Sequence, residues 1–138
     1  MTALLLALAC GGSKLPTATL TIEGHPVHAE VAATDAHRQR GLMFRDRLAP
    51  DAGMLFIYPD TKVRGFWMKD TRIPLSIAFA DSEGVIVRIA DMKPFDESRT
   101  SSLYPAMYAL EMEKGWFAQK GIEKGAVIEG LPHDVQPE

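Results

Sequence analysis

Four charged residues lie within apolar segments of the chain, and they are the first candidates for chemistry. They are Arg45, Lys69, Asp70 and Glu111. An unpaired charge in an apolar setting costs free energy, so each should be paired or exposed. One interpretation is a polar cleft in which Arg45 or Lys69 binds an anionic group and Asp70 or Glu111 acts as a general acid or base. The other is a network of ion pairs and hydrogen bonds that fixes strand ends, with Arg45 bonding carbonyl groups of the neighbouring loop.

No established catalytic pattern accompanies these charges. A glycosidase needs two carboxyl groups roughly 5 to 10 Å apart across a groove, and nothing in the sequence places Asp70 near Glu111. The serines at positions 98, 101 and 102 lack a Gly-x-Ser-x-Gly turn and an evident histidine partner. No glycine-rich loop opens a long helix, as a phosphate-binding loop would. The sequence therefore assigns no catalytic residue.

Trp67 is the aromatic residue best placed to contact a ligand. Alternation in the segment 65–69 puts Phe66 and Met68 on one face and Trp67 and Lys69 on the other. Because Lys69 needs water or a partner, that face should open to solvent or to a cleft. Trp67 could then stack against a sugar or a peptide, whereas core packing is the alternative.

The sequence indicates neither a metal site nor a cofactor. Methionines such as Met43, Met54 and Met68 lie in apolar runs, where the flexible side chain fills gaps in a core. His25 and His28 flank Pro26 without the facing geometry of a zinc pair, and no cysteine or second histidine pair completes four ligands. We therefore expect no bound metal and no cofactor.

Short elements must position these side chains. Alternation and turn residues predict a hairpin over 17–31 with a turn at 24–26, a strand over 54–58 that ends at Pro59, a strand over 65–69, a hairpin over 75–89 and strands over 107–112 and 126–129. Thr34 or Asp35 can cap a short helix that Gly41 ends, and a second helical turn fits 115–120. The stretch 93–102 has no period and suits a lid or mobile loop. About eight short strands with one or two short helices predict a mainly β domain, either a sandwich or a partly closed barrel.

Length and charge limit the organisation and the partners of the chain. A chain of 138 residues with 46% hydrophobic content is long enough for one core and too short for two ordinary domains. We place the domain at residues 17–130 and read 131–138 as a loose polar tail. The net charge of -3 gives no basic surface for nucleic acid, so we expect no nucleic-acid partner.

The N-terminus is similar to a bacterial lipoprotein signal. An apolar run over residues 3–9 precedes Cys10, and a run of this length is too short to span a bilayer. Cys10 would then be the lipidated first residue of the mature protein, residues 1–10 a signal-like segment and 11–16 a linker. This predicts a lipid anchor at Cys10 and a location on the periplasmic or outer-envelope face. The alternative is an apolar N-terminus with a free thiol.

Several motifs resemble the prokaryotic family called domain of unknown function 192. They are Gly41-Leu42-Met43-Phe44-Arg45, Gly53-Met54-Leu55-Phe56 and the run from Phe66 to Leu75, followed by Phe79-Ala80-Asp81, Pro94, Ser102, Pro105-Ala106, Leu110-Glu111, Gly115 and Gly121-Ile122. Asp70 stands where the family more often has Asn, and Ser76 where Asp is usual. The resemblance implies a mainly β fold, a secreted or lipid-anchored location in many members and no established activity.

These observations favour a binding or accessory domain of the cell envelope, with a cleft around Arg45, Trp67, Lys69, Asp70 and Glu111. The expected ligand is a small molecule, a glycan or a peptide. Two alternatives remain: a hydrolase or lyase that acts on envelope polymers with Asp70 or Glu111 as acid or base, and a purely structural or interaction domain. The sequence does not predict an oligomeric state.

Overall fold

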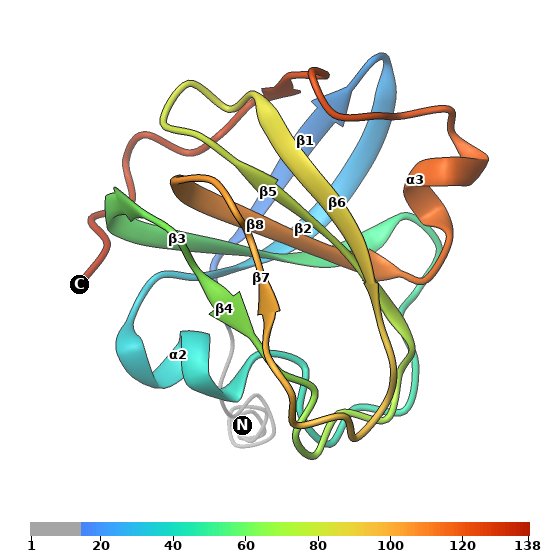
Figure 1. The fold of residues 1–138 in the computed structure, drawn as a ribbon. Coiled ribbons are helices and arrows are strands. Elements are labelled where there is room, and N and C mark those ends of the chain that lie inside the picture. Colours follow the sequence, from blue (N-terminus) through green and yellow to red (C-terminus); the bar gives the residue numbers. More distant parts are fainter. Residues whose placement is uncertain (1–14) are drawn as a thin grey trace, which may run out of the picture.

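The computed structural model describes residues 15–138 as a mainly β domain with nine strands and two short helices (Figure 1). The elements are β1 (Thr17–Ile22), β2 (His25–Ala32), α2 (Asp35–Arg40), β3 (Ala52–Lys62), β4 (Gly65–Phe66), β5 (Leu75–Ala80), β6 (Ile86–Met92), β7 (Thr100–Ser101), β8 (Ala106–Glu113), α3 (Trp116–Gln119) and β9 (Ile128–Glu129). Cys10 lies outside the described residues, and so do the signal-like segment and most of the expected linker. No helix within residues 15–138 is both long and apolar enough to cross a membrane.

Seven strands form one curled sheet in the order β6-β5-β8-β3-β2-β1-β9, and β4 and β7 form a second, small sheet. Neighbouring strands are antiparallel except β2 and β3, which are parallel. The two ends of the large sheet meet, because Val85 forms a bridge with Val127 and the Ile86 N–H donates to the Ala126 carbonyl at 2.8 Å. The predicted mainly β class is confirmed, and the large sheet has the partly closed barrel form.

The central strands β3, β5 and β8 are buried on both faces. Along β3, Leu55 and Ile57 join an apolar cluster that draws residues from all seven strands and so fills the inside of the curl. Met54 and Phe56 point the other way, into a second cluster covered by β4 and the segments around it. Side chains on the two faces of these strands therefore pack into two different apolar clusters, and neither face is open to water.

Helix α2 follows the local signals of the sequence. The Thr34 hydroxyl accepts the His37 N–H at 3.1 Å, and Gly41 ends the helix with a φ of 49°. The Arg38 guanidinium fastens the helix to the sheet by donating to the carbonyls of Ala33 and Ile57, each at 2.8 Å. These hydrogen bonds hold α2 in place, and α2 forms one wall of a cavity.

Three local expectations were wrong. Pro59 does not end β3, which continues to Lys62 with an irregular register between Ile57 and Lys62. The expected strand over 65–69 is reduced to β4, although Phe66 and Met68 are buried while Lys69 is exposed, as the alternation predicted. The stretch 93–102 contains β7, which pairs with β4 and ties this stretch to the domain.

The C-terminal segment contains no helix or strand, yet it is packed against the domain. Leu131 is buried and Val135 packs against the first apolar cluster. The Glu138 N–H donates to the Ala33 carbonyl at 2.9 Å. The expectation of a loose tail was therefore wrong.

Candidate functional site

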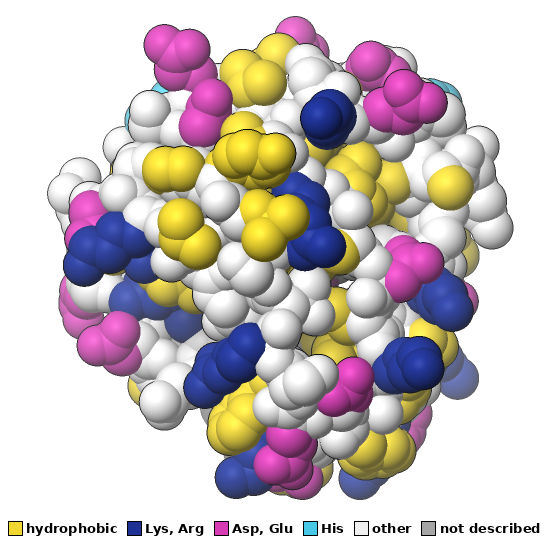
Figure 2. All heavy atoms as spheres, in the orientation of Figure 1, with side chains coloured by type: hydrophobic (Ala, Val, Ile, Leu, Met, Phe, Trp, Pro, Cys, Tyr) yellow, Lys and Arg dark blue, Asp and Glu magenta, His cyan; other side chains and the backbone are white. Residues whose placement is uncertain are grey.

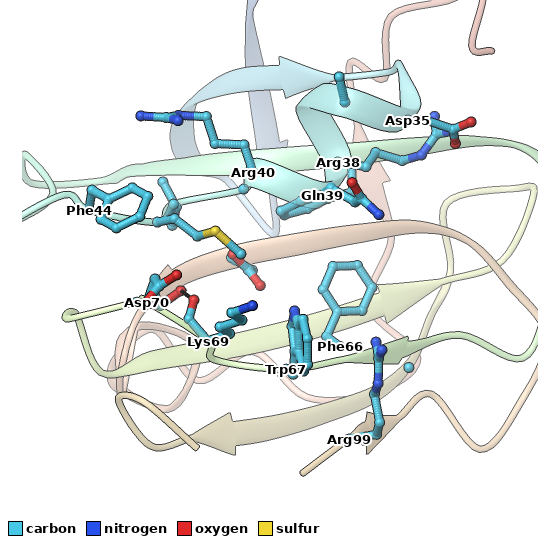
Figure 3. A pocket seen from close by; sticks show the side chains of 18 of the residues that line it. Asp35, Arg38, Gln39, Arg40, Phe44, Phe66, Trp67, Lys69, Asp70 and Arg99 are labelled. Carbon is cyan, nitrogen blue, oxygen red and sulfur yellow. Dashed lines mark hydrogen bonds and ion pairs between the residues drawn. The ribbon is translucent and has the colours of Figure 1, made fainter. Parts of the chain in front are cut away.

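A cavity of about 650 Å³ lies between α2 with the residues that follow it, the segment 65–71 and strand β8 (Figure 3). Aromatic side chains form much of its wall: Phe44, Phe56, Tyr58, Phe66 and Trp67. Its charged lining residues come from four parts of the chain: Asp35, Arg38, Arg40, Lys69, Asp70, Arg99 and Glu111. The cavity has the size and mixed lining of small-molecule sites in proteins.

Glu111 is the buried charged residue of this cavity. It lies on β8 opposite Met54 of β3 and Ile77 of β5, both members of the second apolar cluster. Only 4% of the residue is exposed, and no other residue within 15–138 pairs with its carboxyl group. No fully buried side-chain oxygen or nitrogen in this range lacks a hydrogen-bond partner, so the carboxyl group opens onto the cavity that it lines. Burial disfavours the carboxylate and raises the pKa of Glu111 to about 8. At neutral pH the group is therefore mostly a neutral acid that can donate a hydrogen bond into the cavity.

Trp67 and Lys69 lie together at the rim of the cavity (Figure 3). Trp67 is half-buried, and the ammonium nitrogen of Lys69 lies 5.4 Å from the centre of its ring. The guanidinium carbon of Arg99 lies 4.6 Å from the same ring centre. These distances are typical of cation–π contacts.

Asp70 lines the same cavity and has a φ of 53°, in the left-handed region. Asn and Asp adopt this conformation more readily than most side chains, which gives a backbone reason for the residue type at this position. The structure thus brings Trp67, Lys69, Asp70 and Glu111 to one cavity.

Arg45 does not line this cavity. Both terminal nitrogens of its guanidinium group contact the Glu30 carboxylate on β2, one of them at 2.9 Å. This hydrogen bonding raises the pKa of Arg45. Arg45 therefore fits the structural interpretation, with Glu30 as the partner in place of loop carbonyls.

Ser76 also has a structural position. It lies on β5, where its hydroxyl donates to Asp91 at 2.6 Å and accepts the Gly115 N–H at 2.9 Å. The residue is buried and does not line the cavity. Of the two departures from the family pattern, only Asp70 alters the lining of the site.

Sequence reasoning did not place several lining residues in the site, among them Asp35, Arg38, Gln39, Arg40, Phe44 and Arg99. The helix predicted over 35–40 could have indicated Arg40, because a short helix that packs on a sheet presents one side to it. Arg99 had no such signal, since it reaches the cavity through the two-residue pairing of β7 with β4. Tyr58 lies beneath two guanidinium groups, and burial raises its pKa.

Residues 15–138 also form a second cavity, and they contain no cluster suited to a metal ion. No group of three or more His, Cys, Asp and Glu side chains in this range is arranged to hold a metal ion. A second cavity of about 560 Å³ lies between β6, residues 103–104 and the region of α3, and it contains none of the candidate residues.

Comparisons with known proteins agree with this fold. The model of domain of unknown function 192, described as "Uncharacterized ACR", matches residues 18–130. A crystal structure from Sinorhizobium meliloti, described as a candidate transcription regulator, is similar with a TM-score of 0.84 and 32% identity, over 87% of this chain and 98% of that one. A protein of unknown function from Novosphingobium aromaticivorans gives a TM-score of 0.77 and 34% identity, over 86% and 88%. No curated protein matches the chain. The chain belongs to the family called domain of unknown function 192.

Proposed function

We propose that this chain is a binding domain of the cell envelope that holds a small molecule in the cavity beneath α2. The observation that carries the proposal is Glu111, a residue only 4% exposed that lines this cavity and whose carboxyl group pairs with no other residue within 15–138. Because the carboxyl group opens onto the cavity, a molecule that covers it without forming a hydrogen bond would leave it buried and unpaired, at a cost of about 1 to 3 kcal/mol. A ligand that forms a hydrogen bond with the carboxyl group avoids this cost, so Glu111 favours molecules with a matching polar group.

A screen of a mixed small-molecule library by ligand-observed NMR tests the proposal. Gln39 lies on the cavity side of α2, whereas His37 is exposed on the same helix and does not line the cavity. The bulky substitution Gln39→Trp should abolish binding of the hits, and the matched His37→Trp should leave it intact. Hits that bind both variants equally would show that ligands use another surface, and would contradict the proposal.

The envelope location rests on the apolar N-terminal run and Cys10. Fractionation and intact-mass analysis of the protein expressed from its native locus test it directly. A chain that starts at a lipidated Cys10 in the membrane fraction would support the location. An unmodified chain that starts at Met1 in the soluble cytoplasmic fraction would overturn it.

A second candidate function is an enzyme that hydrolyses or eliminates bonds in envelope polymers. Its support is that Glu111 and Asp70 line one cavity and that the Glu111 pKa of about 8 suits a general acid near neutral pH. Incubation with cell-wall glycans and peptides, followed by mass spectrometry, should then reveal new products. Both Glu111→Gln and Asp70→Asn should abolish these products, and turnover that survives in both variants would exclude this mechanism.

A purely structural domain is the third interpretation. It is supported by the Arg45–Glu30 pair, which lies outside the cavity. On this interpretation, alanine variants of Lys69, Asp70 and Glu111 would lose stability before any binding is lost. Binding that disappears at unchanged stability would exclude it.

Binding of DNA is a weaker alternative, although one similar structure is described as a candidate regulator. The net charge is -3, and basic and acidic side chains are interspersed on the face shown in Figure 2. DNA-binding surfaces carry a clustered excess of Lys and Arg. We expect no binding to duplex DNA at physiological salt in an electrophoretic mobility assay.

A further inference from the structure

The rim of the cavity carries two cations on one indole ring. Lys69 and Arg99 lie on opposite sides of Trp67 in Figure 3, with their charged groups 5.4 and 4.6 Å from the ring centre. Because the two cations lie on opposite sides of the ring, each makes its own cation–π contact with the indole. The arrangement keeps positive charge at the mouth of the cavity.

These cations have no carboxylate partner within residues 15–138. Arg40 is in the same situation, with its guanidinium carbon 5.5 Å from the Phe44 ring centre. By contrast, Arg38 is paired with Asp35 in the same cavity lining. The positive charge of the rim is therefore available to a ligand, whereas that of Arg38 is already engaged.

We propose that the cavity takes a small anionic molecule whose carboxylate or phosphate group binds at the Lys69–Trp67–Arg99 cluster. A carbonyl or hydroxyl oxygen of the same molecule accepts a hydrogen bond from the Glu111 carboxyl group deeper in the cavity. This inference rests on the proposed binding function and names its ligand class. An acidic sugar or another hydroxy or oxo acid has both required groups.

The charge state of Glu111 fits an anionic ligand. Burial raises its pKa to about 8, so at pH 7 the group adds no negative charge that would repel an anion. The other ionisable residues that line this cavity belong to α2, β3 and the segments around β4 and β7: Asp35, Arg38, Arg40, Tyr58, Lys69, Asp70 and Arg99. Four of these are cations and two are carboxylates, so the lining is positive while Glu111 is neutral. Above pH 8 the Glu111 carboxylate forms and weakens binding of an anion.

Matched probes that differ only in charge test the inference. D-glucuronate and glucose 6-phosphate are the anions, D-glucose is neutral and D-glucosamine is cationic; benzoate, benzamide and benzylamine give the same comparison on an aromatic body. Nitrogen-15 NMR of the full chain reports binding through the indole N–H of Trp67. The chain has two tryptophans, and Trp116 is the internal control because its indole N–H donates to Asp51 at 2.9 Å away from the cavity.

We expect the anions to shift the Trp67 signal and to bind at least about tenfold more tightly than the neutral probes at pH 6.5. The affinity for the anions should fall about tenfold by pH 9, because that pH lies about one unit above the pKa of Glu111. This fall should be absent in Glu111→Gln, whose amide keeps a hydrogen-bond donor and does not ionise. The double variant Lys69→Ala/Arg99→Ala should lose the preference for anions. The double variant Arg47→Ala/Lys93→Ala should keep it, because it removes the same charge from two exposed residues that do not line the cavity.

The outcomes separate this inference from the proposed function. Stronger binding of the carboxylate than of the phosphate, or the reverse, identifies the anionic group. Neutral or cationic probes that shift Trp67 at equal or higher affinity would overturn the anionic assignment while leaving the cavity as a binding site. A Trp67 signal that no probe of any charge shifts would overturn this inference, whereas the library screen with Gln39→Trp decides the proposed binding function.

Discussion

The Phe44 N–H donates a 2.9 Å hydrogen bond to the Asp70 carbonyl, and both residues have a left-handed backbone, with φ values of 68° and 53°. Both also line the cavity beneath α2. Such a conformation is unusual for a bulky residue such as Phe44 and costs free energy. The bond joins the segment after α2 to the segment after β4, so it sets the spacing of two walls of the site.

The backbone at position 70 leads to a prediction on stability. Asp70→Ala should lower the free energy of unfolding by about 1 kcal/mol, because alanine enters the left-handed region less readily than Asp or Asn. Asp70→Asn removes the charge, keeps the local conformation and should cost little. Urea denaturation of the two variants measures this difference. An equal loss in both would mean that the carboxylate, and not the backbone, determines the stability at this position.

The cap of α2 gives a second prediction. Thr34→Ala removes the hydroxyl that accepts the His37 N–H, and should lower the free energy of unfolding by about 1 kcal/mol. Thr34→Ser keeps the acceptor and is the matched control. Because α2 forms one wall of the cavity, Thr34→Ala should also speed amide hydrogen exchange over residues 35–40. Exchange that is unchanged while stability falls would show that the helix depends on Arg38 alone.

Local sequence patterns predicted most of the strands and both helices. Alternation predicted both hairpins, although the first turn lies at Glu23 and Gly24, with φ values of 50° and 82°, and not at 24–26. His25 and Pro26 are already in β2. A two-residue turn with two positive φ values suits the twist of a hairpin. The prediction placed the turn too far along the chain because it treated Pro26 as a turn residue.

The site depended on contacts that no local pattern encodes. Glu111 reaches the cavity because β8 lies between β3 and β5, an order that alternation cannot give. Arg99 arrives through the pairing of two strands of two residues each, which are too short to show a period. The sequence therefore indicated that Glu111 needed a partner or water, but not which residues would surround it.

The Arg45–Glu30 pair gives a third prediction. Each side chain is about one-third exposed, at 36% and 32%, so solvent screens the interaction and its contribution should be modest. A double-mutant cycle with Arg45→Gln and Glu30→Gln should give a coupling of about 0.5 to 1 kcal/mol. Neither variant should change ligand affinity, because Arg45 lies outside the cavity. Loss of binding in Arg45→Gln at unchanged stability would place Arg45 in the site after all.

Glu111 gives the fourth prediction, the dependence of stability on pH. Its pKa is about 8 in the folded chain, against an ordinary value of 4.5, so between these values the folded state binds the proton more tightly than the unfolded state. The contribution of Glu111 to stability is therefore fully present below about pH 4.5 and is lost as the pH rises towards 8, at up to about 1.4 kcal/mol per pH unit. Glu111→Gln lacks this loss, so the variant should gain stability relative to the wild-type chain across that range.

Urea denaturation from about pH 5 to about pH 8 measures this gain in stability. The control is Glu113→Gln, because Glu113 is an exposed residue at the end of the same strand. Parallel pH profiles for the wild-type chain and Glu111→Gln would mean that water or relaxation of the fold lets the carboxylate form at its ordinary pKa, and Glu111 would then carry a negative charge at neutral pH.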